Sequence, residues 1–402
     1  MAAAGVAACL FAVRGALEGD FKGVVIPDLT TLLVATGSIV IAYLVCMGPV
    51  YSWMESVPVK LMLPRPLVDE SQYCARLLSI LVFFIQLTFL VFCLVEQVGI
   101  AGSTRLSDLP LKYVWVLFPA DAIFLVYYCL YRRSRWILLN LGIYMLSNVL
   151  WGWLGFWLVI LFVEGAYRML ERRFDWKRIT ALLTVFAIFI PYLVEIKWKM
   201  RDHGYAFLAN VSNLMDMARE VDWRQSMLLT LERSLMRLQH VDNVTVIINN
   251  STFLSEKVQH REFLYFFEEG LPQFALERLI GWPRIPDIHL KLLDYFAVFK
   301  PTAPGVVSNT HTGLVGWFWI TPSWWLAYVG YVFLLAWLGI WLANKQENSG
   351  LIVEFAWFAG LSWLMNGWFG AYIEFLQAMV VILCLRIFIN RSLPSVGRAS
   401  HV

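Results

Sequence analysis

Long apolar runs constrain the fold of this chain more than any other feature of its sequence. An α-helix rises 1.5 Å per residue, so about 20 apolar residues cross the roughly 30 Å hydrocarbon core of a bilayer. The runs that meet or approach this length are 31–53, 75–98, 112–131, 136–167, 179–196, 313–343, 351–368 and 370–389. They predict a chain that crosses a membrane repeatedly.

Two of these runs are too long for one straight span. Glycines interrupt the run 136–167, which predicts a hairpin of two short spans. The run 313–343 is broken around Pro322, which predicts a short re-entrant or interfacial piece and then a span from Ser323. Together the runs predict about 9–10 transmembrane helices, the tenth being the short apolar segment 2–13.

The composition agrees with an all-α polytopic membrane protein. Of the 402 residues, 59% are hydrophobic and only 15% are charged, which excludes an ordinary soluble domain. The net charge of +3 is small for this length and indicates no nucleic-acid partner. All six cysteines lie in or beside apolar runs, so they predict neither a disulfide framework nor a CxxC metal site.

One polar insert, from about Lys197 to Thr312, interrupts the apolar pattern. It divides the chain into an N-terminal transmembrane bundle (1–196), a loop domain (197–312), C-terminal transmembrane helices (313–390) and a tail (391–402). The short connections between spans are rich in arginine and lysine, and such loops stay in the cytoplasm. Alternation then places the tail in the cytoplasm and the insert on the other face, the periplasm of a bacterium or the lumen of a eukaryote.

The segment 223–240 of the insert has the pattern of an amphipathic helix. Its apolar face carries Met227, Leu231, Leu235 and Leu238, and its opposite face carries Arg233, Arg237 and His240 at i, i+4 and i+7. This pattern predicts a helix that lies against the membrane or the span ends, with a basic stripe turned away. The stripe is either a solvated face or an anion-binding surface, and both interpretations stay open at this point.

Further basic residues follow in the loop-rich remainder of the insert. They are Arg278, Arg284, His289, Lys291, Lys300 and His311. The planar donor set of arginine fits phosphate oxygens, so several arginines at a membrane surface can bind a lipid-linked sugar diphosphate. The same donors can neutralise the charge that develops on a diphosphate leaving group.

Two histidines of the insert are candidate general bases. An imidazole titrates near neutral pH, so His240 or His311 can accept the proton of a sugar hydroxyl, although each is also explained as a polar surface residue. Carboxylate clusters typical of a magnesium site do not stand out, and the nearest pair, Glu268 and Glu269, follows an aromatic run. The sequence therefore predicts a site without metal or cofactor.

Four stretches of the sequence resemble a known family. They are RSRWILLNLGIYMLSNVLWGWLGFW, then LLTLERSLMRLQHVDNV at the start of the large loop, LERLIGWPRIPD, and FKPTAPGVVSNTHTGLVGWFW before the closing spans. In this order they are similar to the Wzy-type polysaccharide polymerases, bacterial inner-membrane enzymes that polymerise exopolysaccharide and O-antigen repeat units. The resemblance covers roughly residues 30–390.

The resemblance implies a fold and an activity. Such enzymes have an all-helical, glycosyltransferase C-like architecture related to O-antigen ligases, and they join undecaprenyl-diphosphate-linked oligosaccharides on the periplasmic face without a nucleotide sugar. A flippase and a chain-length co-polymerase are the implied protein partners. Carried onto this chain, the resemblance assigns catalysis to His311, Arg237 and Arg278. It assigns substrate binding to Arg233, His240, Arg284 and Lys300.

Two other functions remain open from the sequence. An O-antigen ligase type of lipid-carrier glycosyltransferase would differ in its acceptor, which is lipid A core rather than a repeat unit. A non-enzymatic transporter of lipid-linked glycans would carry charges deep in several spans. Only Asp121 lies convincingly deep in a predicted span, which favours an enzyme.

Overall fold

The computed structural model describes residues 1–26, 28–56, 72–101, 103, 109–132, 134–171, 176–203, 216, 219–279, 281–298, 310–346 and 350–392. Within these ranges every regular element is a helix, apart from an isolated bridge between Ala16 and Val25. Helices satisfy their own backbone hydrogen bonds, as a lipid environment requires. The prediction of an all-α polytopic membrane protein is confirmed at this level.

In the part of the chain that the structure describes, five helical segments are long and apolar enough to cross a membrane. They are Leu29–Met54, Cys74–Glu96, Lys112–Leu130, Pro322–Gln346 and Phe369–Ile389. The elements that form them are α2 (Leu29–Val45), a π-helical turn (Cys46–Val50), α3 (Tyr51–Ser56), α4 (Gln72–Glu96), α5 (Lys112–Leu117), α6 (Ala120–Leu130), α18 (Trp325–Gln346) and α20 (Phe369–Ser392). Pro49 lies within the π-helical turn, where the regular backbone hydrogen-bond pattern is interrupted.

The other apolar runs form shorter or less apolar helices. The run 136–167 forms two helices, α7 (Ile137–Leu150) and α8 (Phe156–Leu170), and the next predicted span belongs to α9 (Trp176–His203). That the two helices form a hairpin of spans stays a prediction. The run 351–368 forms α19 (Leu351–Ala359), which continues in a π-helical turn (Gly360–Leu364). The segments Ala2–Arg14 (α1), Ile137–Leu150 and Leu351–Leu364 are apolar but shorter than a full span. The described residues thus contain five candidate spans, and the full set of 9–10 stays a prediction.

The insert packs against the first spans rather than standing apart. Its helices are α12 (Trp223–Gln239), α13 (Val241–Asn249), α14 (Ser251–Gln259), α15 (Leu271–Leu279) and α16 (Ile288–Phe296), followed by α17 (Gly313–Ile320). Helix α13 packs on α2 and α17, while α12 packs on α1 and α9. Val244 and Ile247 of α13 are fully buried in the same core as residues of α2 and α20. One hydrophobic core thus joins the insert to the spans.

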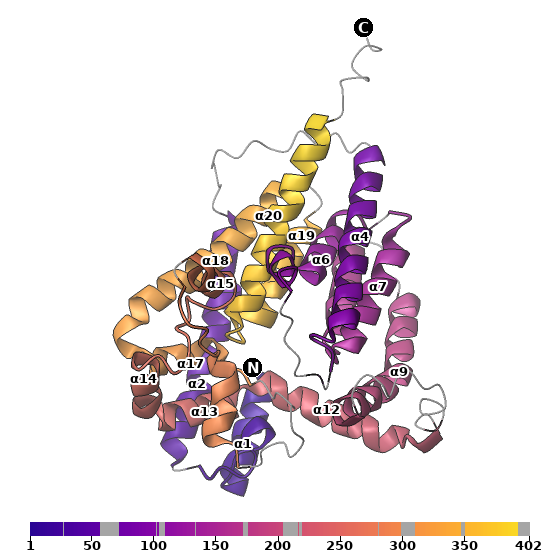
Figure 1. Cartoon of the computed structure of the whole chain (residues 1–402). Coiled ribbons are helices and arrows are strands. Elements are labelled where there is room, and N and C mark those ends of the chain that lie inside the picture. The colour runs from indigo at the N-terminus through magenta and orange to yellow at the C-terminus, as the bar shows by residue number, and fades with distance from the viewer. Residues whose placement is uncertain are drawn as a thin grey trace.

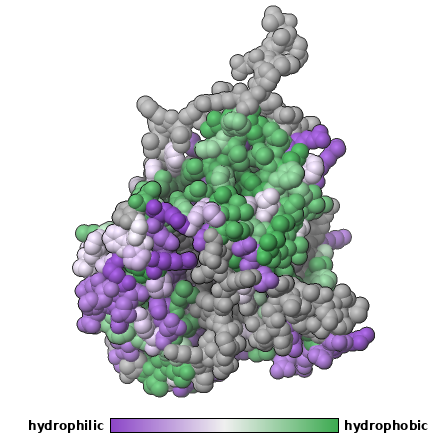
Figure 2. Space-filling model, viewed as in Figure 1, coloured by the Kyte–Doolittle hydropathy of each residue, from purple (hydrophilic) through white to green (hydrophobic). Residues whose placement is uncertain are grey.

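The C-terminal end of α20 lies at the opposite end of the bundle from α1, α12 and α13 (Figure 1). Figure 1 shows the C-terminal end at the top, and α1, α12, α13 and α17 at the bottom. On the face in Figure 2, hydrophobic residues gather over the upper half, where α4, α6 and α20 lie, and hydrophilic residues gather at the lower left, around α14. Which end faces the cytoplasm stays a prediction.

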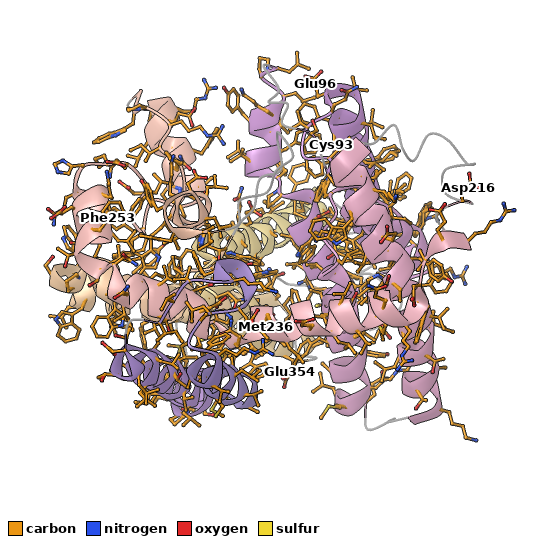
Figure 3. The ribbon with its side chains drawn as sticks, turned by 90° about the horizontal axis from the view of Figure 1, so that it is seen from below. Cys93, Glu96, Asp216, Met236, Phe253 and Glu354 are labelled. Atoms are coloured by element: carbon orange, nitrogen blue, oxygen red, sulfur yellow. The ribbon has the colours of Figure 1, made fainter. Side chains whose placement is uncertain are left out.

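Helix α12 is amphipathic, as predicted, and its leucine face is exposed. The side chains of Leu231, Leu235 and Leu238 are each at least half exposed, whereas Gln239 is buried at the end of the helix. Viewed from below in Figure 3, Met236 of this helix lies near the middle of the molecule. That the leucines contact the membrane stays a prediction.

We expect one glycine of α18 to be essential for packing. A Cβ atom at Gly339 would overlap the hydroxyl of Tyr372 on α20 and lie 3.1 Å from its Cζ atom, and Tyr372 is buried. Gly339→Ala should therefore lower the free energy of unfolding by about 1–3 kcal/mol. Gly330→Ala, on the same helix but facing open space, is the control and should be neutral or slightly stabilising. Thermal unfolding in detergent that ranks the two variants equally would contradict this packing.

Candidate functional site

Four segments that are distant in sequence meet at one buried point, which we call the polar junction. It consists of Gly19–Phe21, residues 239–243 between α12 and α13, residues 310–313 before α17, and residues 366–368 before α20. Buried polar side chains cluster here among apolar helices. Buried polar groups need partners, so such a junction is a candidate site and its hydrogen bonds are informative.

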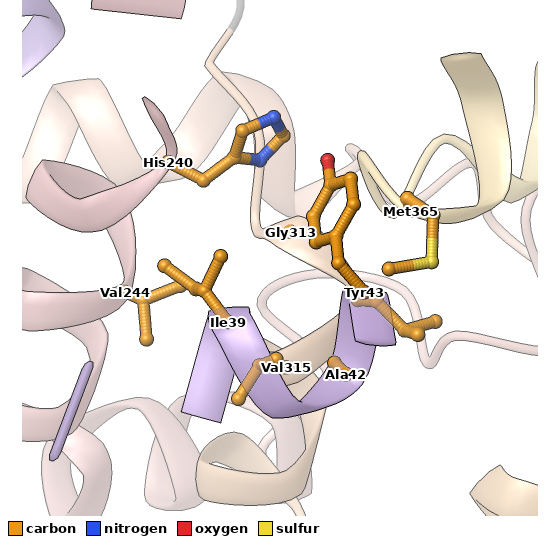
Figure 4. Close-up of a pocket in the computed structure, with 9 residues that line it drawn as sticks. Ile39, Ala42, Tyr43, His240, Val244, Gly313, Val315 and Met365 are labelled. Atoms are coloured by element: carbon orange, nitrogen blue, oxygen red, sulfur yellow. The ribbon is translucent and has the colours of Figure 1, made fainter. Parts of the chain in front are cut away.

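His240 forms the corner between α12 and α13. Its backbone has a φ of 54°, a left-handed conformation that few residues other than glycine adopt, and this ends one helix and starts the next. The corner turns the imidazole into the protein, where it stacks on the ring of His311 with centroids 5.6 Å apart. Figure 4 shows His240 above Val244 and facing the space beside Tyr43 and Gly313.

His311 lies in an extended segment that is tied down on two sides. The side-chain amide of Asn243 donates to the His311 carbonyl oxygen at 2.6 Å, and the Trp368 ring packs edge-on against the imidazole at 4.2 Å. The Gly313 N–H then donates to the Asn366 carbonyl at 3.2 Å. Gly367, at φ 75°, lies against the segment where any Cβ atom would overlap the Thr312 hydroxyl. Only glycine fits there.

Two carboxyl groups lie on the other side of the junction. Asp242 accepts hydrogen bonds from the side-chain amide of Gln239 at 2.6 Å and from the Asn243 N–H at 2.8 Å. The Asp20 N–H donates to the same carboxyl group at 3.3 Å. The Asp20 carboxylate in turn accepts from the Thr310 hydroxyl at 2.7 Å. The carboxyl groups therefore connect the N-terminal turn, α13 and the His311 segment.

A third histidine holds the start of the same segment. His289 Nδ1 lies 3.0 Å from the Thr310 carbonyl oxygen, and its Nε2 lies 3.5 Å from the Glu269 carboxylate. Burial opposes a charge on His289, but Glu269 outweighs it and the pKa of His289 is raised. Burial, with Glu269 adding to it, also raises the pKa of the neighbouring Asp287.

Burial shifts the two central titratable groups in opposite directions. It lowers the pKa of His240 to about 4, although a hydrogen bond with the Asn366 side chain raises it in part. It raises the pKa of Asp242 to about 7, and the Asp20 charge adds to this shift. At neutral pH His240 is therefore an uncharged imidazole, and burial favours the protonated form of Asp242.

A large apolar cavity adjoins the junction. Its volume is about 580 Å³, and it lies among α2, α3, α17, α18, α19 and α20. A smaller space beside His240 shares four lining residues with it, namely Ala42, Leu314, Val315 and Met365. Ligand pockets of several hundred Å³ bury most of a ligand of moderate size. An apolar chamber thus borders a polar centre.

The structure brings together only some of the predicted site residues. His240 and His311 meet, and both are buried, so the alternative that they are surface residues is wrong. Arg278 is exposed on α15, with its guanidinium 3.5 Å from the Tyr113 ring centroid. Arg284 is exposed near Asp287. The side chains of Arg233 and Arg237, and the whole of Lys300, lie outside the described residues.

Sequence reasoning missed the carboxyl groups of the junction. Asp242 and Asn243 follow His240 closely in the LQHVDNV stretch, directly before an apolar run. Polar residues in this position, where one helix ends and an apolar helix begins, could have indicated the buried site. Nothing local marked Asp20 or Trp368, because their roles arise from contacts with residues that are distant in the sequence, Thr310 for Asp20 and His311 for Trp368.

Comparison with protein-family models, with curated proteins and with solved structures finds no match for this chain. Within the described residues, no three His, Cys, Asp or Glu side chains are grouped so that they could hold a metal ion.

The neutral state of His240 predicts a pH effect on stability. An unfolded histidine binds a proton below about pH 6.5, whereas folded His240 binds one only near pH 4, so the wild type loses stability as the pH falls through this window. His240→Gln should remove up to about 3 kcal/mol of this loss, at about 1.4 kcal/mol per pKa unit. His260→Gln, at an exposed position, is the control. Equal acid sensitivity of His240→Gln and wild type in thermal unfolding would contradict a buried, neutral His240.

Proposed function

We propose that this chain is a membrane glycosyltransferase that polymerises undecaprenyl-diphosphate-linked oligosaccharide repeat units and releases undecaprenyl diphosphate. The observation that carries the proposal is the apolar cavity that borders the polar junction. A lipid-linked sugar likewise has an apolar part, its long chain, and a polar part, its reacting end, which match the cavity and the junction respectively. The bacterial inner membrane, with the insert in the periplasm, is the location that belongs to this proposal.

The cavity supplies an apolar environment for part of the isoprenoid chain. Its walls are side chains of spans, so the chain leaves lipid without entering water. The cavity meets the space beside His240 at Ala42, Leu314, Val315 and Met365. A lipid bound in the cavity with its head at these residues would place that head near His240 and His311. The same border separates the chain from the groups that would act on the sugar.

The proposed reaction needs one base and one set of cations. His311, or His240 beside it, takes the proton of the acceptor hydroxyl as that oxygen bonds to the anomeric carbon of the growing chain. The bond between that carbon and the diphosphate breaks, and the diphosphate leaves with the electron pair. Arg237 and Arg278 neutralise this charge, while Arg233, Arg284 and Lys300 bind the substrate. No metal, cofactor or nucleotide sugar takes part in the proposal.

A direct assay tests the activity. Purified protein is incubated with undecaprenyl-diphosphate-linked repeat unit and a chelator, and product length is followed on a gel. We expect a ladder of lipid-linked oligomers in wild type and its loss in Arg237→Ala and Arg278→Ala, with Arg224→Ala on the exposed start of α12 as the control. Movement of the intact lipid across a vesicle bilayer, without a ladder, would indicate a transporter. Near-normal chain length in both variants would contradict the arginine assignment.

The cavity predicts a separate effect on the lipid. Ala42 lines both the cavity and the space beside His240, so Ala42→Phe should place a bulky side chain at the border between them. We expect its KM to rise about tenfold for the undecaprenyl substrate and much less for an analogue with a short prenyl chain. Leu33→Phe, on the exposed face of the same helix, should leave both values unchanged. An equal change for both lipids would show that the cavity does not bind the chain.

A further inference from the structure

The two carboxyl groups of the polar junction have no part in the proposed reaction, yet they hold its histidine segment. We propose that Asp20 and an uncharged Asp242 act as positioning residues, which together clamp residues 310–312 and so fix His311. The clamp does not depend on the proposed function, because it is a statement about the order of this segment.

The contacts reach the segment from two directions. On one side, the Asp20 N–H bonds to the Asp242 carboxyl group, and the Asp20 side chain accepts from the Thr310 hydroxyl. On the other side, Asn243 donates its N–H to Asp242 and its side-chain amide to the His311 carbonyl. Both routes start at Asp242. A change in its charge therefore acts on both ends of the clamp.

Close packing leaves the Asp242 carboxyl group little room to adjust. It lies against Gly19, where a Cβ atom would be only 2.6 Å from Oδ2, and Gly19 has a φ of 72°. Asp242 is 2% exposed, while Asp20 is half-buried. A buried carboxylate beside a second one is costly in free energy unless one of them is protonated.

Among the side chains that the structure describes, no cation bonds to Asp242. Its described donors are the Gln239 amide and two backbone N–H groups, all of them neutral. The titratable and charged groups facing this region are Asp20, His240, His311, His289 with Glu269 beyond Thr310, and the amino group of Met1, which acts on His240. Arg14 and Lys22 both pair with Glu18 instead.

Loss of the proton weakens the clamp from the Asp20 side. Three N–H groups donate to the Asp242 carboxyl group, whereas the Asp20 side chain accepts from the Thr310 hydroxyl. Repulsion between two carboxylates is therefore relieved by moving Asp20, which takes the acceptor away from Thr310. The raised pKa of Asp242, about 7, puts this change within the range of ordinary buffers.

Hydrogen exchange tests the clamp directly. The amides of Thr310, Gly313 and Leu314 donate to His289, Asn366 and Met365, so their protection reports the order of the segment. The full chain in nanodiscs is compared at pH 6 and pH 8.5, with exchange times corrected for the intrinsic rate. We expect the wild-type segment to lose about tenfold in protection at the higher pH. The reason is that the pKa of Asp242, about 7, lies one unit above pH 6, and one pKa unit corresponds to a factor of ten.

Asp242→Asn imitates the uncharged state and is the decisive variant. Its Oδ1 can still accept from Gln239 and Asn243, and only the 3.3 Å bond from the Asp20 N–H is lost. We expect equal protection at both pH values in this variant and wild-type behaviour in Glu232→Gln, an exposed carboxyl change on α12. Asp20→Asn repeats the test by removing the charge of the other carboxyl group, and its protection is measured at the same two pH values. Unchanged protection in wild type between pH 6 and 8.5 overturns the proposal whether or not either variant folds.

Discussion

The burial of α13 between α2 and α17 is the interaction on which the rest of the structure depends. Val244 and Ile247 are fully buried there, and burying side chains of this size contributes about 1.5–3 kcal/mol each. The same packing carries His240 and Asp242, at the start of α13, into the protein. Because α17 begins directly after His311, the contact that closes the core also brings the two histidines together.

This arrangement combines two environments that are seldom adjacent. The cavity among the spans is apolar, whereas the junction holds neutral His240 and a carboxyl group that titrates near neutral pH. Low polarity around the junction strengthens each of its hydrogen bonds and raises the cost of each unmatched charge. A lipid-linked polar molecule matches such a border, since its two parts have opposite requirements.

The sequence predicted the helices better than it predicted their contacts. Apolar runs and breaks at glycine or proline located α4, α18, α20 and the two helices α7 and α8, because these features act within one helix. The length of each helix was less predictable, because the run 351–368 forms an apolar helix shorter than a full span. His240 and His311 were recognised as candidates by their chemistry alone. Asp20 was not, because it meets Thr310 only after the insert has folded onto α1 and α2.

The proposed function requires that the cavity and the polar junction are two parts of one lipid-binding site. A cryo-electron microscopy map of the protein in nanodiscs with undecaprenyl diphosphate tests this most directly. The account predicts density for the isoprenoid chain among α2, α17, α18 and α20, with the diphosphate at the border near His240 and His311. An empty cavity, with the lipid bound on another face of the bundle, would contradict it.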